Sequence, residues 1–247
     1  THLRLDHTDR IKNLQTILNY YSKNFEGAKF IMVEDDTSHN DNFDSVKWPK
    51  NTAFYFIKNR GLHLKSRSLN YGIHQADTPV VVALDTDCIV PVSSMHKCTD
   101  ACMNGATMAY PYNGYFIDAS YNMHDKFREG DYDFSILREP LPVIDTLTLG
   151  QSLPEFYVRC TNTGHLGGEF HQGVGGIAIF NKELLLEMGG YNEKFIGWGG
   201  EDNEINERCL ILEHEQFRDD DIEAICFHLF HQSAVRNNNP YYEANMV

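Results

Sequence analysis

Two aspartates separated by one residue follow an apolar run at residues 80–84. The segment reads Asp85-Thr86-Asp87. Carboxylates at the end of a buried strand can both reach a hard divalent cation, which prefers oxygen ligands and often keeps substrate phosphates in its shell. Such a pair also commonly caps a strand-to-loop turn. An isolated Asp-x-Asp fits both interpretations, so the motifs further along the chain must decide between them.

A second motif combines glycines, a tryptophan and two acids, in the order Trp198-Gly199-Gly200-Glu201-Asp202. Glycines let the backbone approach a ligand closely, and tryptophan offers a flat apolar face of the kind on which sugars stack. The two acids open a predicted helix, where the helix dipole favours their ionised form. An ionised Asp202 can act as a general base. A glycine turn before an acidic helix start would explain part of this string but not all of it.

Two histidines, His228 and His231, lie at the end of a predicted strand over 224–229. A histidine on an apolar strand is more often a satisfied core residue than a ligand. A metal site at Asp85 and Asp87 would need further ligands, however, and this favours a ligand role for the two histidines.

The elements that must position these residues alternate along the chain. Helical periodicity covers 9–21, 62–76, 182–188 and 201–212, and strand-like runs cover 29–33, 53–57, 80–84, 106–110, 114–118, 174–180 and 224–229. The alternation predicts an α/β fold with a doubly wound sheet, whose ligands bind beyond the carboxyl ends of the strands. Asp35, Asp36, Asp85 and Asp87 fall at such ends. Residues 119–172 show weak periodicity and are predicted to form a long functional loop.

Composition narrows the class of protein. Among 247 residues there are 35 acidic and 21 basic ones, a formal charge of −14. This charge repels a phosphate backbone and argues against general nucleic-acid binding. A phosphorylated ligand would need a cation to bring it in, and a metal ion is the natural candidate. No run approaches the roughly 20 apolar residues that a membrane span needs.

Six cysteines are spread through the chain without the paired spacing of a zinc site. Cys98 and Cys102 are four residues apart on a predicted helix, which indicates core packing. No Asn-x-Ser/Thr sequon occurs, which favours a reducing compartment. The chain begins at Thr1 without methionine, so we expect that a longer chain was trimmed. Neither repeats nor linkers are visible, which predicts a single domain over 1–247.

Together these motifs resemble those of the GT-A-fold glycosyltransferases. Residues 173–182, 189–193 and 197–202 are similar to the C-terminal signature of β-1,4-galactosyltransferase-like enzymes, whose kin include polypeptide GalNAc-transferases and bacterial chondroitin polymerases. Residues 1–6, 33–36, 59–61 with Lys65 and Asn70, and 85–87 are similar to the nucleotide-binding half. The motifs occur in the family's order, and only 119–172 gives no match. The resemblance implies one Rossmann-like doubly wound mixed sheet with helices on both faces, a nucleotide-binding half at 1–90 and an acceptor-binding and catalytic half at 91–247.

The resemblance also assigns roles to single residues. It implies that Mn²⁺, or Mg²⁺, is bound by Asp87 with His228 and His231, which take the place of a Met and a His three residues apart in the galactosyltransferases. It implies that Asp202 deprotonates the acceptor hydroxyl. The donor nucleotide would be bound by Arg4, Asp6, Asp35, Asp36, Asn59, Lys65 and Asp85. The donor sugar and the acceptor would be bound by Gly175, Gly176, Trp198, Gly199, Gly200 and Glu201.

The implied reaction is metal-dependent and inverting. A hexose or N-acetylhexosamine would move from a UDP-sugar to the hydroxyl of a saccharide or lipid-linked saccharide. With neither sequon nor anchor visible, we expect a bacterial enzyme of surface polysaccharide synthesis at the cytoplasmic face of the membrane, rather than one of the Golgi lumen. Segments outside this sequence would supply any peripheral membrane association.

Two rival interpretations remain at this point. Residues 84–90 also resemble the nucleophile motif of haloacid-dehalogenase-type phosphohydrolases, with Asp85 as nucleophile, Asp87 as acid/base and Asp219 to Asp221 as magnesium ligands. That motif normally lies on the first strand, whereas two strand-and-helix units precede it here. The other rival is an inactive sugar-binding module that holds a glycan with Trp198 and the metal.

Overall fold

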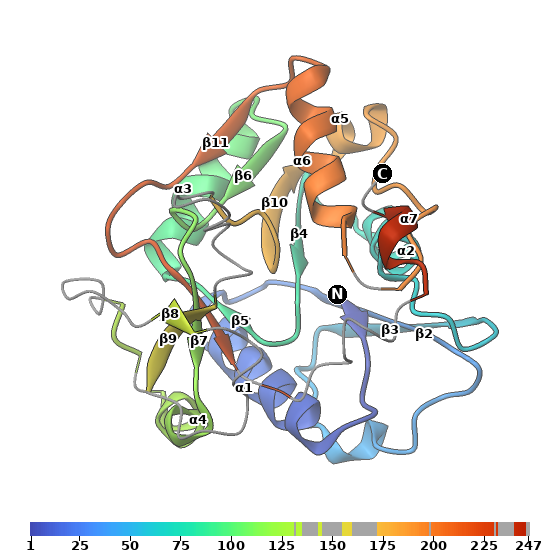
Figure 1. Ribbon diagram of the computed structural model, residues 1–247, viewed down its shortest axis with the longest axis vertical. Coiled ribbons are helices and arrows are strands. Elements are labelled where there is room, and N and C mark those ends of the chain that lie inside the picture. The colour runs from blue at the N-terminus through green and yellow to red at the C-terminus, as the bar shows by residue number, and fades with distance from the viewer. Residues whose placement is uncertain are drawn as a thin grey trace.

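The computed structural model describes residues 1–130, 132–134, 143–144, 155–159, 172–197, 199–229, 231 and 240–245. Helices and strands alternate along the chain (Figure 1). The elements are β1 (His2–Leu3), α1 (Thr8–Asn24), β2 (Phe30–Asp36), the 3-10 helix η1 (Phe43–Ser45), β3 (Thr52–Lys58), α2 (Lys65–Gln75), β4 (Val80–Leu84), β5 (Cys88–Ile89), α3 (Val92–Met103), β6 (Met108–Tyr110), β7 (Phe116–Ala119), α4 (Tyr121–Glu129), β8 (Val143–Ile144), β9 (Phe156–Arg159), β10 (Ile177–Asn181), α5 (Lys182–Glu187), α6 (Glu201–Ile211), β11 (Gln216–Arg218), β12 (Cys226–Leu229) and α7 (Tyr242–Asn245).

The strands form three hydrogen-bonded sheets, in the orders β1-β2-β3, β11-β6-β10-β4 and β5-β12-β7-β9-β8. β10 is antiparallel to both β4 and β6, which makes the second sheet mixed. The predicted α/β class and mixed strand directions are confirmed. The single sheet is corrected to three hydrogen-bonded sheets. Beside the first of them, the Thr1 side chain contacts the end of β4, where its Oγ1 donates to the Leu84 carbonyl at 2.9 Å.

The core explains why these segments fold as they do. In α1, Leu14, Ile17, Leu18 and Tyr21 are buried at helical spacing. The larger apolar cluster joins the strands of the second and third sheets to α3, where Cys98 and Cys102 are both fully buried, as their spacing predicts. The predicted helices at 9–21, 62–76, 182–188 and 201–212 are present as α1, α2, α5 and α6, with shifted ends.

Two regions differ from the prediction. β2 continues three residues beyond the predicted apolar run at 29–33, and Asp35 and Asp36 are its last residues, at the strand end where they were expected. The parallel pairing with β3 extends that far and sets Asp36 beside Lys58. The described part of 119–172 contains α4, β8 and β9 instead of a continuous loop. α4 buries Met123 and ends at Gly130, which adopts the left-handed conformation that favours glycine.

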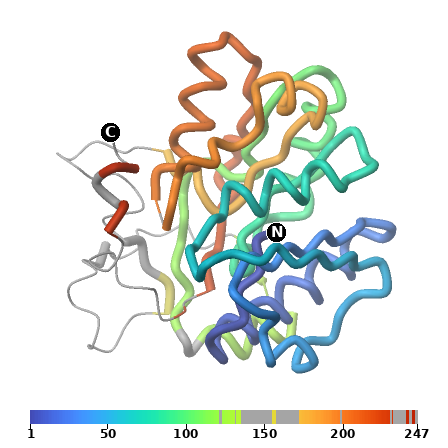
Figure 2. The backbone as a smooth tube through the Cα atoms, turned by 90° about the vertical axis from the view of Figure 1, so that its right-hand side faces the viewer, coloured from blue at the N-terminus to red at the C-terminus, as the bar shows by residue number. Residues whose placement is uncertain are grey.

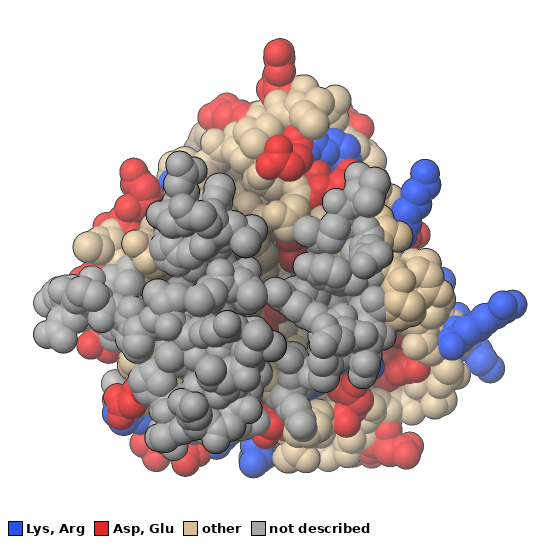
Figure 3. Space-filling model, in the orientation of Figure 1, with Lys and Arg blue, Asp and Glu red and all other residues tan. Residues whose placement is uncertain are grey.

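The arrangement in space places the turn after β4 centrally. In two views at right angles, the N-terminal segment in blue lies in the lower part of the molecule and α6 in orange lies in its upper part (Figures 1 and 2). Among the described residues, no helix has both the length and the apolar character needed to cross a membrane. Acidic side chains are scattered over the described surface of the face drawn in Figure 3 rather than gathered in one patch.

Candidate active site

The Asp-x-Asp turn is fixed by two other parts of the chain. Alternate residues of β4 are buried, and the strand ends at Leu84. The Asp85 N–H donates to the Gly176 carbonyl at 2.7 Å, and the Asp87 carbonyl accepts from the Leu229 N–H at 2.8 Å. The turn therefore brings the segment before β10 and the end of β12 together.

The three predicted metal ligands do lie together. The Oδ2 atom of Asp87 is 3.0 Å from Nε2 of His231 and 3.7 Å from Nε2 of His228. Within the described ranges, these residues form the one group whose potential ligand atoms all lie within 4.8 Å of one another. One carboxylate and two imidazoles are a donor set for a first-row divalent ion.

Charge interactions shift the pKa values in this group. Burial by itself would raise the pKa of Asp87, but His228 and His231 hold that pKa well below its usual value of 3.8. Burial would lower the pKa of His228, but Asp87 and Asp118 raise it to about 9. An ionised carboxylate thus faces both imidazoles.

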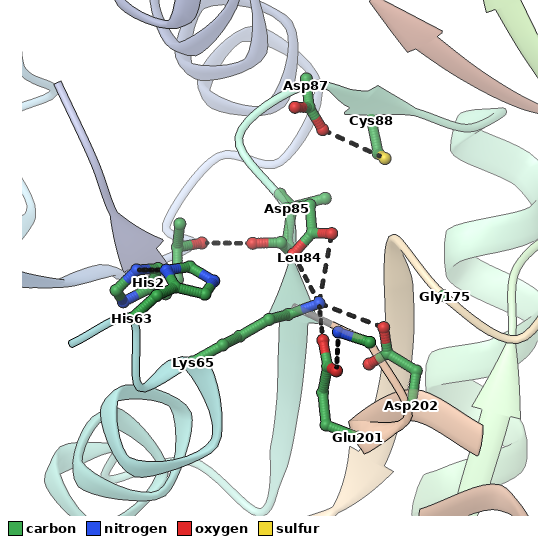
Figure 4. Close-up of polar contacts among 12 residues, drawn as sticks. His2, His63, Lys65, Leu84, Asp85, Asp87, Cys88, Gly175, Glu201 and Asp202 are labelled. Carbon is green, nitrogen blue, oxygen red and sulfur yellow. Dashed lines mark hydrogen bonds and ion pairs between the residues drawn. The ribbon is translucent and has the colours of Figure 1, made fainter. Parts of the chain in front are cut away.

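A second cluster of charges surrounds Lys65 (Figure 4). The Nζ atom lies 3.1 Å from Oδ1 of Asp85, 3.3 Å from Oε1 of Glu201 and 3.1 Å from Oδ2 of Asp202. The start of α2, the end of β4 and the start of α6 therefore meet at one ammonium group. Burial would lower the pKa of Lys65, but the three acids, Asp202 first among them, raise it well above 10.5. Lys65 was expected to contact the donor nucleotide. The structure places it among three acids for which the resemblance implied different roles: nucleotide binding for Asp85, sugar binding for Glu201 and proton transfer for Asp202.

The surroundings of Asp202 raise the pKa of its carboxyl group. Burial is the main cause that raises its pKa to about 7, and Glu201 and Asp85 add to the rise while Lys65 opposes it. A carboxyl group is most effective as a base when its pKa lies near the working pH. Its side chain remains 22% exposed, so a substrate can reach it.

The predicted glycines create close backbone approaches around the base. A Cβ atom on Gly175 would lie 3.1 Å from Oδ2 of Asp202. Gly176 has φ +83°, and its Cβ would lie 2.6 Å from Cε2 of Phe116. Gly200 precedes α6 with φ +91°, and the Gly199 N–H donates to Oε2 of Glu201 at 3.1 Å. Trp198 lies outside the described residues.

Two of the predicted nucleotide-binding residues, Asp35 and Asn59, bind each other. The Asp35 side chain is fully buried, and Arg67 donates to its two oxygens at 2.6 and 2.7 Å. Asn59 donates to the same carboxylate. Asp36 accepts from the Thr37 N–H at 2.6 Å. Arg67 was missed by the sequence analysis, although it lies only two positions after Lys65 in α2.

Arg4 and Asp6 form an ion pair of 2.9 Å beside a pair of histidines. Arg4 Nη1 lies 3.4 Å from Nδ1 of His63, and His63 lies 3.2 Å from Nε2 of His2. Burial, together with Arg4 and Lys65, lowers the pKa of His63 to about 4, so this ring is neutral at pH 7. The sequence analysis assigned no role to either histidine.

Asp219 and Asp221, which the phosphohydrolase interpretation assigns as magnesium ligands, lie elsewhere. Asp219 accepts from Lys97 of α3 at 2.9 Å, and Asp221 lies 3.9 Å from the same ammonium. They line a cavity of about 570 Å³ between α1, α3 and the loop after β11, and none of the described residues predicted for the transferase site borders it. Among the described residues, they are not part of the group around Asp87.

An α/β fold with an Asp-x-Asp turn after β4 and an acid opening α6 is the arrangement expected of a GT-A glycosyltransferase. The family model "Glycosyltransferase like family 2" matches residues 6–221, and the chain belongs to this family.

The chain is similar to GalNAc-T7, crystallised with UDP, GalNAc and Mn²⁺, with 14% identity, a TM-score of 0.48 and coverage of 88% of this chain and 40% of that one. It is also similar to the mannosyltransferase PcManGT of Pyrobaculum calidifontis in complex with GDP-Man and Mn²⁺, with 14% identity, a TM-score of 0.48 and coverage of 98% and 57%. The chain thus spans about half the length of these proteins. No curated protein matches it.

Proposed function

We propose that the chain is a metal-dependent, inverting glycosyltransferase that moves a hexose or N-acetylhexosamine from a UDP-sugar to a saccharide hydroxyl. The supporting observation is that one ammonium, Lys65, lies 3.1 Å from both Asp85 and Asp202. The base and the Asp-x-Asp turn therefore share one site. UDP, rather than another nucleotide, is inferred from the resemblance to the galactosyltransferase group.

Three residues of this chain offer a set of donor atoms that suits a divalent metal ion. Asp87, His228 and His231 offer three ligand atoms that converge, two of them imidazole nitrogens and one a carboxylate oxygen. We propose that they hold Mn²⁺ or Mg²⁺. When bound, the ion stabilises negative charge on the leaving diphosphate.

The chain's own residues carry out the proton transfer. Asp202 accepts the proton of the acceptor hydroxyl, whose oxygen then bonds to the anomeric carbon while the bond from that carbon to the UDP oxygen breaks. Lys65 holds Asp202 close to the Asp-x-Asp turn. Attack opposite the leaving group inverts the anomeric carbon.

For the nucleotide, we propose that Arg67 replaces Asp35 as the contacting group. The Asp35 carboxylate is fully buried and already accepts from Arg67 and Asn59, whereas the Arg67 side chain is 33% exposed. Asp35 would then orient Arg67 toward the ligand. Arg4, Asp6, Asp36, Asn59, Lys65 and Asp85 keep their proposed donor-binding role. We also propose a bacterial surface polysaccharide or its lipid-linked precursor as acceptor, at the cytoplasmic face of the membrane.

Calorimetric titration of UDP, with Mn²⁺ and again with excess chelator, is the primary test. We expect binding that depends on Mn²⁺, and weaker binding of GDP. UDP binding that is unaffected by the chelator would contradict the metal dependence. Nucleotide-sugar binding without transfer across a panel of saccharide acceptors would support the sugar-binding module instead. Hydrolysis of an aryl phosphate that is lost in Asp85→Asn would support the phosphohydrolase.

A further inference from the structure

We infer that Asp118 is a positioning residue for His228 and fixes the imidazole so that its Nε2 atom faces Asp87. The Asp118 side chain is fully buried, and its Oδ1 accepts a hydrogen bond from Nδ1 of His228 at 2.7 Å. Nε2 of the same ring lies 3.7 Å from Oδ2 of Asp87. The inference rests on the proposed function, because it concerns the metal ion proposed there.

The sheet sets the distance between Asp118 and His228. β7 and β12 are parallel neighbours, and their register places His228 opposite Asp118 and Cys226 opposite Phe116. Residues paired across neighbouring strands point to the same face of the sheet. The carboxylate and the imidazole are thus held together by backbone pairing, although they are 110 residues apart in the sequence.

The face of the imidazole is held as well. The ring of Phe116, two residues before Asp118 on the same face of β7, lies 5.2 Å from the His228 ring between centroids, at an interplanar angle of 32°. Phe116 in turn packs so closely on Gly176 that a Cβ atom there would lie 2.6 Å from Cε2. Asp118 at one edge and Phe116 at one face restrict rotation of the imidazole.

The hydrogen bond also selects the tautomer. A carboxylate only accepts hydrogen bonds, so Nδ1 of His228 carries the proton that it donates to Asp118. In the neutral ring, the lone pair is then on Nε2, the atom that faces Asp87. A carboxylate bonded to the far nitrogen of a ligating histidine fixes the ring and makes it a stronger donor to the metal.

The test is the Mn²⁺ affinity of the full chain, followed by the electron paramagnetic resonance signal of the free ion. We expect Asp118→Ala to weaken Mn²⁺ binding by about 10- to 100-fold. Asp118→Asn should weaken it less, because the amide oxygen can still accept from Nδ1 but carries no charge. Asp219→Asn is the matched control, since the Asp219 side chain is only 4% exposed but is bonded to Lys97. We expect the control to bind Mn²⁺ as the unaltered chain does.

A second readout separates positioning from folding. Pulsed resonance spectra of the Mn²⁺ complex report the coupling to histidine nitrogens, and Asp118→Asn should change the coupling of one nitrogen while the protein stays folded. Unchanged affinity and unchanged coupling in this variant would overturn the inference. If Asp118→Ala does not fold, the affinity and the nitrogen coupling of Asp118→Asn test the inference by themselves. If the unaltered chain binds no Mn²⁺, the proposed metal site is overturned and this inference with it. If the unaltered chain binds Mn²⁺ and the affinity is the same in both Asp118 variants, only the inference is contradicted.

Discussion

The Nζ atom of Lys65 lies 3.1 Å from the Oδ2 atom of Asp202, although 137 residues separate them in the sequence. The contact joins the first turn of α2 to the first turn of α6. Since Asp85 is held by the same ammonium, loss of Lys65 would leave three neighbouring carboxylates without their shared cation. The pKa of Asp202 therefore depends on a residue 137 positions earlier in the chain.

Asp202→Asn should strongly reduce transfer and leave UDP binding intact, because an amide cannot accept the proton of the acceptor. Positioned acid or base groups contribute about 10²- to 10⁴-fold to rates, so we expect a loss of kcat in that range. Glu207→Gln, an exposed acid on the same helix, is the control and should retain activity. Near-normal kcat in Asp202→Asn would remove Asp202 as the base.

The pH dependence of kcat/KM should follow the ionisation of Asp202. Its pKa is raised to about 7, and only the ionised form accepts a proton, so activity should rise with pH through about 7 and then level off. Lys65 opposes this rise in the pKa, so Lys65→Gln should move the midpoint to higher pH. A midpoint that stays in place in Lys65→Gln would show that Lys65 does not control the base.

Part of the candidate site could be predicted from its motifs. The resemblance to the galactosyltransferases, with the need of a metal site for further ligands, predicted that Asp87, His228 and His231 lie together, and this is confirmed. Helical periodicity placed Asp202 at the start of a helix, which is α6 in the structure. It could not show that Lys65 joins Asp85 to Asp202, since helix α2 was known only as a periodic segment.

Some contacts that were not predicted from the sequence depend on pairing between strands that are far apart in the chain. Asp118 acquires its role because β7 lies beside β12, and the order of strands in a sheet does not follow from their order in the chain. The pairing of β2 with β3 up to Asp36 likewise lengthened β2 and drew Asp35 into a buried contact with Arg67. β5 and β11 escaped prediction because two or three residues are too short for a periodic pattern.

Loss of both histidines should weaken the Mn²⁺-dependent binding of UDP. His228→Ala combined with His231→Ala leaves Asp87 as the single member of the ligand group. We expect a loss of at least about 100-fold, because even an outer partner of a metal ligand is commonly worth 10- to 100-fold. His214→Ala is the control, since His214 bonds Thr107 near β11. Calorimetry with and without chelator measures the effect, and unchanged affinity would exclude the pair from the metal site.

Arg67→Ala should destabilise the fold because it deprives a buried carboxylate of its cation. Asp35 would keep its bond from Asn59 but lose two charged hydrogen bonds. Hydrogen bonds to charged groups contribute about 1.5–3 kcal/mol, and Arg67 is one-third exposed, so we expect a loss of about 1–3 kcal/mol in the free energy of unfolding. Arg128→Ala is the matched control, because Arg128 pairs with a largely exposed Asp125 and should change stability little. Urea denaturation measures both variants. Equal stability of the two would mean that Asp35 finds other partners when Arg67 is removed.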